Sequence, residues 1–306
     1  MERIFSNITE LIGNTPLMEL GIFGKKHCPD ARLVAKLERA NPAGSAKDRV
    51  ALNIIKTAER EGKLKKGGMI IEATSGNTGI GLAAVASVLG YEAVIVMPDN
   101  MSAERIKLIK AYGAKVVLTE SAKGMAGALE KAQELCRENE GSIIAGQFEN
   151  PANPEAHYMA TGPEIWRDAD GKVDVFVAGV GTGGTVTGVG RYLKEQNSLI
   201  KIIAVEPDSS ALLSGEAAGP HRIQGIGANF VPSVLDKASY DEVIRITDKE
   251  AFEAMHELAE TEGLFVGVSS GAAAIAAAKV ASRPEFAGKT VVVLLPDTGE
   301  RYLSLL

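Results

Sequence analysis

The chain has 306 residues, enough for two domains or one large α/β unit. Hydrophobic residues make up 45% and charged residues 24% of the sequence, ordinary values for a folded globular protein that exclude a disordered chain, a coiled coil and a collagen. The net charge of −6 has the wrong sign for an electrostatic grip on a phosphate backbone, so nucleic acid is not expected as a partner.

The cysteines and the N-terminal residues indicate the cellular compartment in which the protein works. Cys28 and Cys136 lie far apart and form no C-x-x-C motif, so the sequence predicts neither a disulfide framework nor a metal site. Acidic and polar side chains occupy the first ten residues, where a signal peptide needs an apolar segment, and no apolar run reaches about 18 residues. We therefore expect a cytoplasmic protein that does not span a membrane.

Short apolar segments alternate along the chain with longer segments of helical periodicity, which is typical of an α/β fold with parallel sheets. The predicted strands are residues 32–37, 69–73, 93–97, 115–119, 173–179, 200–205 and 290–295. The predicted helices are residues 51–62, 79–89, 103–112, 125–138, 185–195, 251–262 and 271–281, and we expect them to be amphipathic. Glycine favours the left-handed conformation that ends a helix, and four such stops are predicted, at Gly62, Gly90, Gly113 and Gly263.

The strongest motif is a glycine-rich segment between a predicted strand and a predicted helix: Gly179-Val180-Gly181-Thr182-Gly183-Gly184-Thr185. Backbone N–H groups, the helix N-terminus and the threonine hydroxyls could together hold a phosphate. A tight turn without a ligand is the structural alternative. Gly179, Gly181 and Gly184 also fit G-x-G-x-x-G, and Glu206 ends the next strand, so a nicotinamide dehydrogenase is a second functional interpretation.

A second loop, Thr74-Ser75-Gly76-Asn77-Thr78-Gly79, also joins a predicted strand to a predicted helix. Its hydroxyls, amide and backbone donors suit a carboxylate, whereas helix capping by Ser75, Asn77 or Thr78 is the structural alternative. Two anion sites in one chain indicate a ligand, or a pair of ligands, with two separate anionic groups.

Lys47 follows a predicted N-cap residue, Ser45, and falls in the first turn of a helix. A cation at this position opposes the helix dipole, and such local conflicts are expected where function overrides stability. Its amine could serve as a nucleophile. Taken alone, Lys47 fits a solvated surface lysine better, so its neighbours decide its interpretation.

Together these segments resemble the cysteine synthases (O-acetylserine sulfhydrylases) of the pyridoxal-phosphate-dependent β-family, which also contains cystathionine β-synthase. The resemblance runs nearly from end to end, through Ile12-Gly13-Asn14-Thr15-Pro16, Met101-Ser102-Ala103-Glu104-Arg105, Gln147-Phe148, Gly225-Ile226-Gly227-Ala228, Ser269-Ser270-Gly271 and Gly299-Glu300-Arg301-Tyr302. It implies a two-domain, fold type II enzyme similar to the tryptophan synthase β-subunit. The smaller α/β domain, residues 40–146, would carry the substrate-carboxylate loop, and the larger, residues 1–39 plus 147–306, the phosphate loop, with the cofactor in the cleft between them.

The resemblance also implies the cofactor, pyridoxal 5′-phosphate, and a role for each site residue. Lys47 would be the Schiff-base lysine and the acid–base group, Asn77 would contact the 3′-oxygen, and Ser269 would meet the pyridine nitrogen. The phosphate would be held by Gly181, Thr182, Gly183, Gly184 and Thr185. The substrate carboxylate would be held by Thr74, Ser75, Gly76, Asn77, Thr78 and Gln147. His157, which no acid or nucleophile adjoins, is expected as a surface or hydrogen-bonding residue at a helix start.

The implied reaction is a β-replacement that forms L-cysteine and acetate from O-acetyl-L-serine and sulfide. A cystathionine β-synthase-like enzyme that uses serine or O-acetylserine with homocysteine is the first alternative. The resemblance leaves the second substrate open among sulfide, thiosulfate and homocysteine. A dehydrogenase gives no role to Lys47 or to loop 74–79, and a non-catalytic binding protein has no need of Lys47. The resemblance further implies a homodimer and a possible complex with the C-terminal tail of serine acetyltransferase.

Overall fold

The computed structural model describes residues 4–101 and 103–305, so Ser102 of the motif 101–105 lies outside the described residues. The chain forms two compact units. Unit 1 consists of Met1–Ile12 and Asn41–Asn153, and unit 2 of Gly13–Ala40 and Pro154–Leu306. Each unit has its own sheet and its own hydrophobic clusters. No helix among the described residues is long and apolar enough to cross a membrane.

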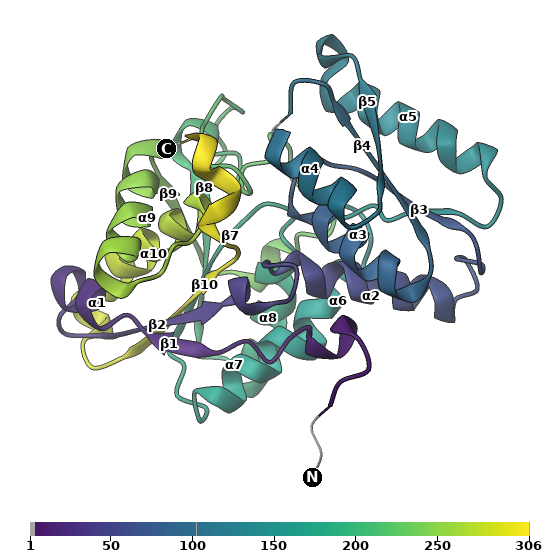
Figure 1. The fold of residues 1–306 in the computed structure, drawn as a ribbon. Coiled ribbons are helices and arrows are strands. Elements are labelled where there is room, and N and C mark those ends of the chain that lie inside the picture. The colour runs from purple at the N-terminus through teal and green to yellow at the C-terminus, as the bar shows by residue number, and fades with distance from the viewer. Residues whose placement is uncertain (1–3, 102, 306) are drawn as a thin grey trace. The chain divides into compact units, whose positions relative to one another are not determined.

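Unit 1 contains a parallel sheet with the order β5-β4-β3-β6 over its described residues (Figure 1). Its strands are β3 (Met69–Ala73), β4 (Glu92–Pro98), β5 (Lys115–Thr119) and β6 (Ile143–Ile144). Its helices are α2 (Lys47–Arg60), α3 (Asn77–Leu89), α4 (Ala103–Ala111) and α5 (Gly124–Glu138). Ile70 packs with Ile54 and Leu82 of α2 and α3, whereas Ile71 packs with Ala128 of α5. The sheet is therefore covered by helices on both faces, because successive strand residues point to opposite sides.

Unit 2 contains a sheet with the order β1-β2-β10-β7-β8-β9 over its described residues, in which β1 is antiparallel to β2 and the other pairs are parallel. Its strands are β1 (Leu17–Glu19), β2 (Arg32–Leu37), β7 (Val175–Gly179), β8 (Lys201–Pro207), β9 (Glu242–Ile246) and β10 (Thr290–Leu295). Its helices include α1 (Gly21–His27), α7 (Gly162–Asp168), α8 (Gly184–Gln196), α9 (Asp248–Glu262) and α10 (Val268–Ala281), and α6 (Ala152–Ala156) spans the boundary between the units. Val177 packs with α10 and Phe176 with α8, so helices cover both faces.

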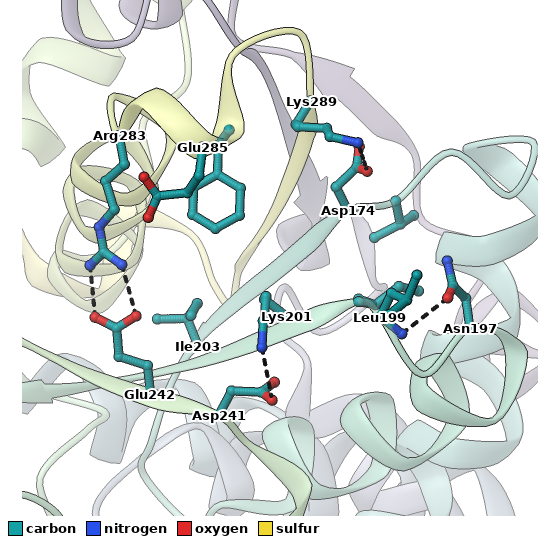
Figure 2. A pocket seen from close by; sticks show the side chains of 13 residues that line it. Asp174, Asn197, Leu199, Lys201, Ile203, Asp241, Glu242, Arg283, Glu285 and Lys289 are labelled. Carbon is teal, nitrogen blue, oxygen red and sulfur yellow. Dashed lines mark hydrogen bonds and ion pairs between the residues drawn. The ribbon is translucent and has the colours of Figure 1, made fainter.

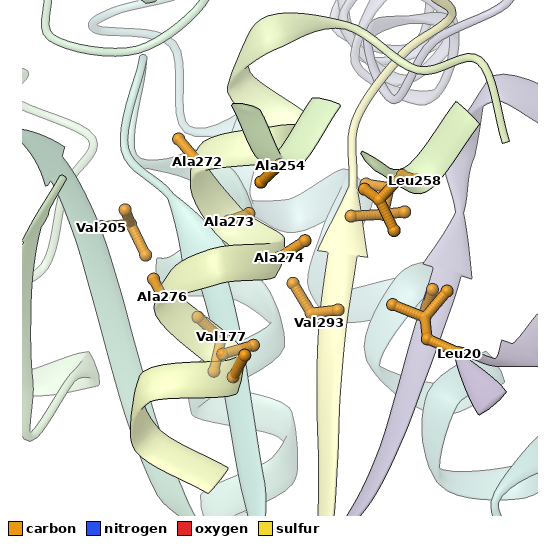
Figure 3. Packing of buried hydrophobic residues seen from close by; sticks show 14 of the residues in the cluster. Leu20, Val177, Val205, Ala254, Leu258, Ala272, Ala273, Ala274, Ala276 and Val293 are labelled. Carbon is orange, nitrogen blue, oxygen red and sulfur yellow. The ribbon is translucent and has the colours of Figure 1, made fainter. Parts of the chain in front are cut away.

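Helix α10 is the centre of the largest hydrophobic cluster of unit 2 (Figure 3). Its alanines lie between Val177, Val205 and Val293 of the sheet and the α9 residues Ala254 and Leu258. The amphipathic pattern expected for this segment is wrong, because a helix enclosed by a sheet and a second helix is apolar on nearly all sides.

The predicted α/β class is confirmed, and the strands predicted at 32–37, 69–73, 115–119 and 290–295 have the observed bounds. Three short strands were not predicted: β1 and β9, which lie at the edges of their sheet, and β6, which has two residues. The helix expected from residue 251 begins at Asp248, because Thr247 and Glu250 form a capping box. The four predicted glycine stops all have φ between +66° and +83°, which confirms them.

Candidate active site

The glycine-rich loop follows β7 and leads into α8. A Cβ atom on Gly181 would lie 2.3 Å from the carbonyl oxygen of Gly225, and one on Gly179 would lie 2.7 Å from Ile226. Gly183 has a φ of +83°, a conformation that side chains rarely adopt. Close packing and backbone conformation thus require these glycines whether or not a ligand binds. Evidence for an anion site must therefore come from the hydrogen-bond donors of the loop.

Two threonines supply such donors at the start of α8. Thr182 and Thr185 are both buried, and the Thr182 hydroxyl oxygen accepts the Gly184 N–H at 3.4 Å. The N-cap residue of this 13-residue helix is Gly183, which has no side chain to cap the first turn. Backbone N–H groups and hydroxyls at a helix N-terminus form a site that suits a phosphate.

His157 supports this loop from a neighbouring π-helical turn, His157–Thr161. Its side chain is completely buried, with Nδ1 2.9 Å from the Thr161 hydroxyl and Nε2 3.2 Å from the Thr185 hydroxyl. Hydrogen bonding was expected of His157, but the expectation of a surface position is wrong. The contact to Thr185 joins residues 28 apart in the sequence, so no local pattern signals it.

Ser269 lies in the first turn of α10 and is buried. A Cβ atom on Gly225 would lie 3.2 Å from the Ser269 hydroxyl, and the Gly225 carbonyl oxygen lies against Gly181. One glycine therefore contacts both Ser269 and the loop 179–185, which the structure brings together in unit 2. The Ser269 hydroxyl can donate or accept a hydrogen bond but carries no charge.

Lys47 is the first residue of α2. Ala46, rather than Ser45, occupies the cap position, although the Ser45 hydroxyl still accepts the Lys47 N–H at 3.2 Å. A Cβ atom on Gly81 would lie 2.9 Å from the Lys47 carbonyl oxygen, so the start of α2 packs against the second turn of α3. Unit 1 thus brings Lys47 close to the start of α3, where loop 74–79 ends.

Loop 74–79 turns between β3 and α3. The Thr74 hydroxyl oxygen accepts the Gly76 N–H at 3.2 Å, and Arg105 donates to the Ser75 carbonyl at 3.4 Å. Gly76 is the N-cap residue of α3, so the alternative that a side chain of this loop caps the helix is wrong. The Thr78 hydroxyl donates instead to Oε1 of Gln147 at 2.5 Å, which joins the loop to the second predicted carboxylate-binding segment.

Glu72 was not singled out from the sequence, yet it lies beside this group at the end of β3. Its carboxyl group is 3% exposed and accepts the Gly146 N–H at 2.7 Å and the Gln147 N–H at 3.4 Å. Burial raises the pKa of Glu72 to about 7, against the hydrogen bonds from Gly146 and Gln147, which lower it. The sequence feature that could have identified Glu72 is its position as an acidic residue within an otherwise apolar strand.

A cavity of about 580 Å³ opens elsewhere in unit 2, at the amino ends of its strands (Figure 2). Charged side chains in its lining form pairs, with Arg283 2.7 Å from Glu242 and Lys289 3.1 Å from Asp174. Ligands of open α/β sheets bind at the carboxyl ends of the strands, where the loop after β7 lies. This cavity is therefore not part of the candidate active site.

Residues 8–297 match the family model described as "Pyridoxal-phosphate dependent enzyme". The chain belongs to this family. The match includes Lys47, both loops and Ser269. The donors also fit the cofactor of this pyridoxal-phosphate-dependent enzyme: an anion site for the phosphate, an uncharged hydroxyl for the ring nitrogen and an amine for covalent attachment.

The enzyme is similar over nearly its whole length to proteins of known class. The cysteine synthase of Staphylococcus aureus (strain Mu50) is 50% identical, over 99% of this chain and 97% of that protein. The crystal structure of the cysteine synthase from Entamoeba histolytica has a TM-score of 0.95 and 49% identity, and covers 99% of this chain and 90% of that chain. The O-acetylserine dependent cystathionine beta-synthase from Helicobacter pylori has a TM-score of 0.91 and 40% identity, covering 99% and 98%.

The dehydrogenase interpretation gives way to this family assignment, and Glu206 supports the change. Its buried carboxylate accepts the Leu213 N–H at 2.7 Å and both the N–H and the hydroxyl of Ser214, at 3.0 and 2.6 Å. The residue that a nicotinamide enzyme would use for its ribose therefore holds a turn of its own chain.

Proposed function

We propose that the protein is a cysteine synthase, which forms L-cysteine and acetate from O-acetyl-L-serine and sulfide. The observation that carries this proposal is the similarity to cysteine synthases, at 50% identity over 99% of the chain, which includes both units. The two groups of donors, one in each unit, match the two anionic groups that the reaction brings: the cofactor phosphate and the substrate carboxylate.

In unit 2, we assign binding of the cofactor phosphate to Gly181, Thr182, Gly183, Gly184 and Thr185. The buried position of both threonines at the start of α8 supports this assignment. We assign the ring nitrogen to Ser269, whose hydroxyl would lie 3.2 Å from a Cβ atom on the same Gly225 that packs on the phosphate loop. A hydroxyl does not hold a proton on that nitrogen as a carboxylate would.

In unit 1, which includes Gln147, we assign covalent attachment of the cofactor to the Lys47 amine. Asn77 would contact the cofactor 3′-oxygen, and the substrate carboxylate would bind Thr74, Ser75, Gly76, Asn77, Thr78 and Gln147. The hydrogen bond from Thr78 to Gln147 supports a common role for these residues. The first turn of α3 adds its partial positive charge to the same loop.

Lys47 performs the proton transfers in this proposal. Pyridoxal phosphate supplies the electron withdrawal that makes the substrate Cα proton acidic. The free amine of Lys47 would remove that proton as a general base and later return one to Cα as a general acid. Acetate leaves without an acid, because it is a stable anion, and sulfide adds at Cβ. The loop 74–79 fixes the substrate carboxylate and so orients the Cα–H bond.

The proposal also covers the compartment, the oligomeric state and a partner protein of the enzyme. We propose a cytoplasmic homodimer that can bind the C-terminal tail of serine acetyltransferase. A terminal carboxylate matches the carboxylate of O-acetylserine, and loop 74–79 would accept either one. Such a tail would therefore compete with the amino-acid substrate.

A cystathionine-forming enzyme is the second candidate, favoured by the 40% identity to the Helicobacter pylori protein. The test is to measure kcat/KM for O-acetylserine and serine, each with sulfide, thiosulfate and homocysteine. We expect O-acetylserine with sulfide to give the highest value, because acetate is a better leaving group than hydroxide and sulfide needs no second amino-acid pocket. A higher value with homocysteine would identify the second candidate.

A further inference from the structure

Gln147 is held at several of its polar groups. Its side-chain oxygen accepts the Thr78 hydroxyl at 2.5 Å, its N–H donates to Glu72 at 3.4 Å, and its carbonyl accepts from the Asn153 amide at 2.7 Å. The Gly146 N–H donates to the other Glu72 oxygen at 2.7 Å. One carboxyl group thus fixes two successive peptide groups, and with them the position from which the Gln147 side chain leaves the backbone.

The position of Glu72 links this turn to loop 74–79. Glu72 is the fourth residue of β3, and the loop begins two residues later, at Thr74. The Gly146 φ of +64° shows that the turn adopts a left-handed conformation, which the carboxyl group stabilises by accepting its N–H. The rigid strand therefore sets the distance between Thr78 and Gln147 through one buried side chain.

We infer that Glu72 is a positioning residue for amino-acid substrate capture, which holds the turn 146–147 so that Gln147 and Thr78 bind the substrate carboxylate together. The inference rests on the proposed function for the role of Gln147 and adds a residue that touches neither substrate nor cofactor. Burial of an acidic group is costly unless hydrogen bonds repay it, so a buried carboxyl group at this place has a use that a neutral strand residue would not serve.

The first test is the Glu72→Gln variant of the holoenzyme. Glutamine keeps the shape but replaces one acceptor oxygen with an NH₂ group, which faces a backbone N–H donor instead of accepting from it. We expect KM for O-acetylserine to rise about tenfold or more, which corresponds to about 1.4 kcal/mol. We also expect kcat to stay within about threefold and KM for sulfide to stay unchanged. The matched control is Glu59→Gln, which removes a carboxylate of α2 that binds Lys56 and Tyr91.

A readout independent of turnover is the ¹H–¹⁵N spectrum of the holoenzyme. The amide signals of Gly146 and Gln147 should shift in Glu72→Gln and stay in place in Glu59→Gln, and the absorbance of the bound cofactor should match the parent in both. A fall in kcat with KM for O-acetylserine unchanged, or unshifted Gly146 and Gln147 signals, would overturn the inference. Shifted signals in a protein that makes no cysteine would instead contradict the proposed function alone.

A double-mutant cycle completes the test. Glu72 acts through Gln147 in this inference, so Glu72→Gln should raise KM for O-acetylserine much less in a Gln147→Leu background than in the parent. Glu72→Asp, which retains the acid but shortens its reach, provides a second variant if Glu72→Gln does not fold, with an increase in KM in the same direction. Full additivity of the two changes would show that Glu72 acts independently of Gln147 and would overturn the inference.

Discussion

Lys47 combines a cation at the first position of a helix with a backbone that packs against the next helix. We expect Lys47→Ala to keep the cofactor through the phosphate loop but to lower turnover by a factor of about 10² to 10⁴, the range of a lost acid–base group. Cofactor absorbance and steady-state rates measure both effects. Lys56→Ala, an exposed lysine of the same helix, should behave like the parent.

The assignment of Lys47 as the attachment residue can also be tested by mapping where the cofactor is covalently bound. Borohydride reduction of the holoenzyme should fix the pyridoxal group on the peptide that contains Lys47. Recovery of the label on another lysine, or full turnover by Lys47→Ala, would contradict the role assigned to this amine.

Glu72 gives the free energy of unfolding a pH dependence of known sign. Its pKa is about 7 in the folded protein against an ordinary value of 4.5, so the folded state binds the proton more tightly. The stability from this group is fully present below about pH 4.5 and is lost as the pH rises through 7, up to ~3 kcal/mol. Urea unfolding at pH 5 and pH 8 should show this loss in the parent but not in Glu72→Gln. Equal losses in both proteins would contradict it.

Among the elements, α10 shows how tightly two helices can pack. A Cβ atom on Gly271 would lie 2.2 Å from the carbonyl oxygen of Ala251 in α9, so the backbones must separate to admit it. We expect Gly271→Ala to lower the free energy of unfolding by about 1 to 3 kcal/mol, measured by chemical denaturation. Gly21→Ala is the control, because nothing lies within 4 Å of that added atom. No difference between the two variants would contradict this packing argument.

Comparison of the predicted and observed elements shows where a sequence pattern is sufficient to predict the bounds of a strand or helix. Strand β10 was predicted to the residue because five apolar residues follow one another from Val291 to Leu295. Strand β9 was missed because Glu242 and Arg245 leave only two consecutive apolar residues between them, and charged residues are usual at a sheet edge. Helix starts were misplaced by up to four residues because side-chain and backbone contacts, rather than periodicity, set them.

For the molecule as a whole, the site motifs that are continuous in the sequence could be predicted. The distant residues whose side chains hydrogen-bond to those motifs could not. The two loops could be found because each stands directly at a strand-to-helix junction, and Lys47 could be found because its segment, taken together with the two loops, resembles a known family. His157 and Glu72 could not, because their contacts reach Thr185 and Gln147, which are 28 and 75 residues away. Such contacts depend on how the strands are ordered within each sheet, and no periodicity in one sequence encodes that order.

The order of strands in unit 2 has a consequence for biosynthesis. Strand β10 lies in the interior of the sheet, between β2 and β7, and its first residue, Thr290, pairs with Arg32. A growing chain therefore carries β2 with an unpaired edge until the ribosome has passed residue 295, whereas all of unit 1 has been made by residue 153. Unit 1 can therefore fold during translation, whereas the edge of β2 stays open to pairing with other chains during nearly the whole of the synthesis.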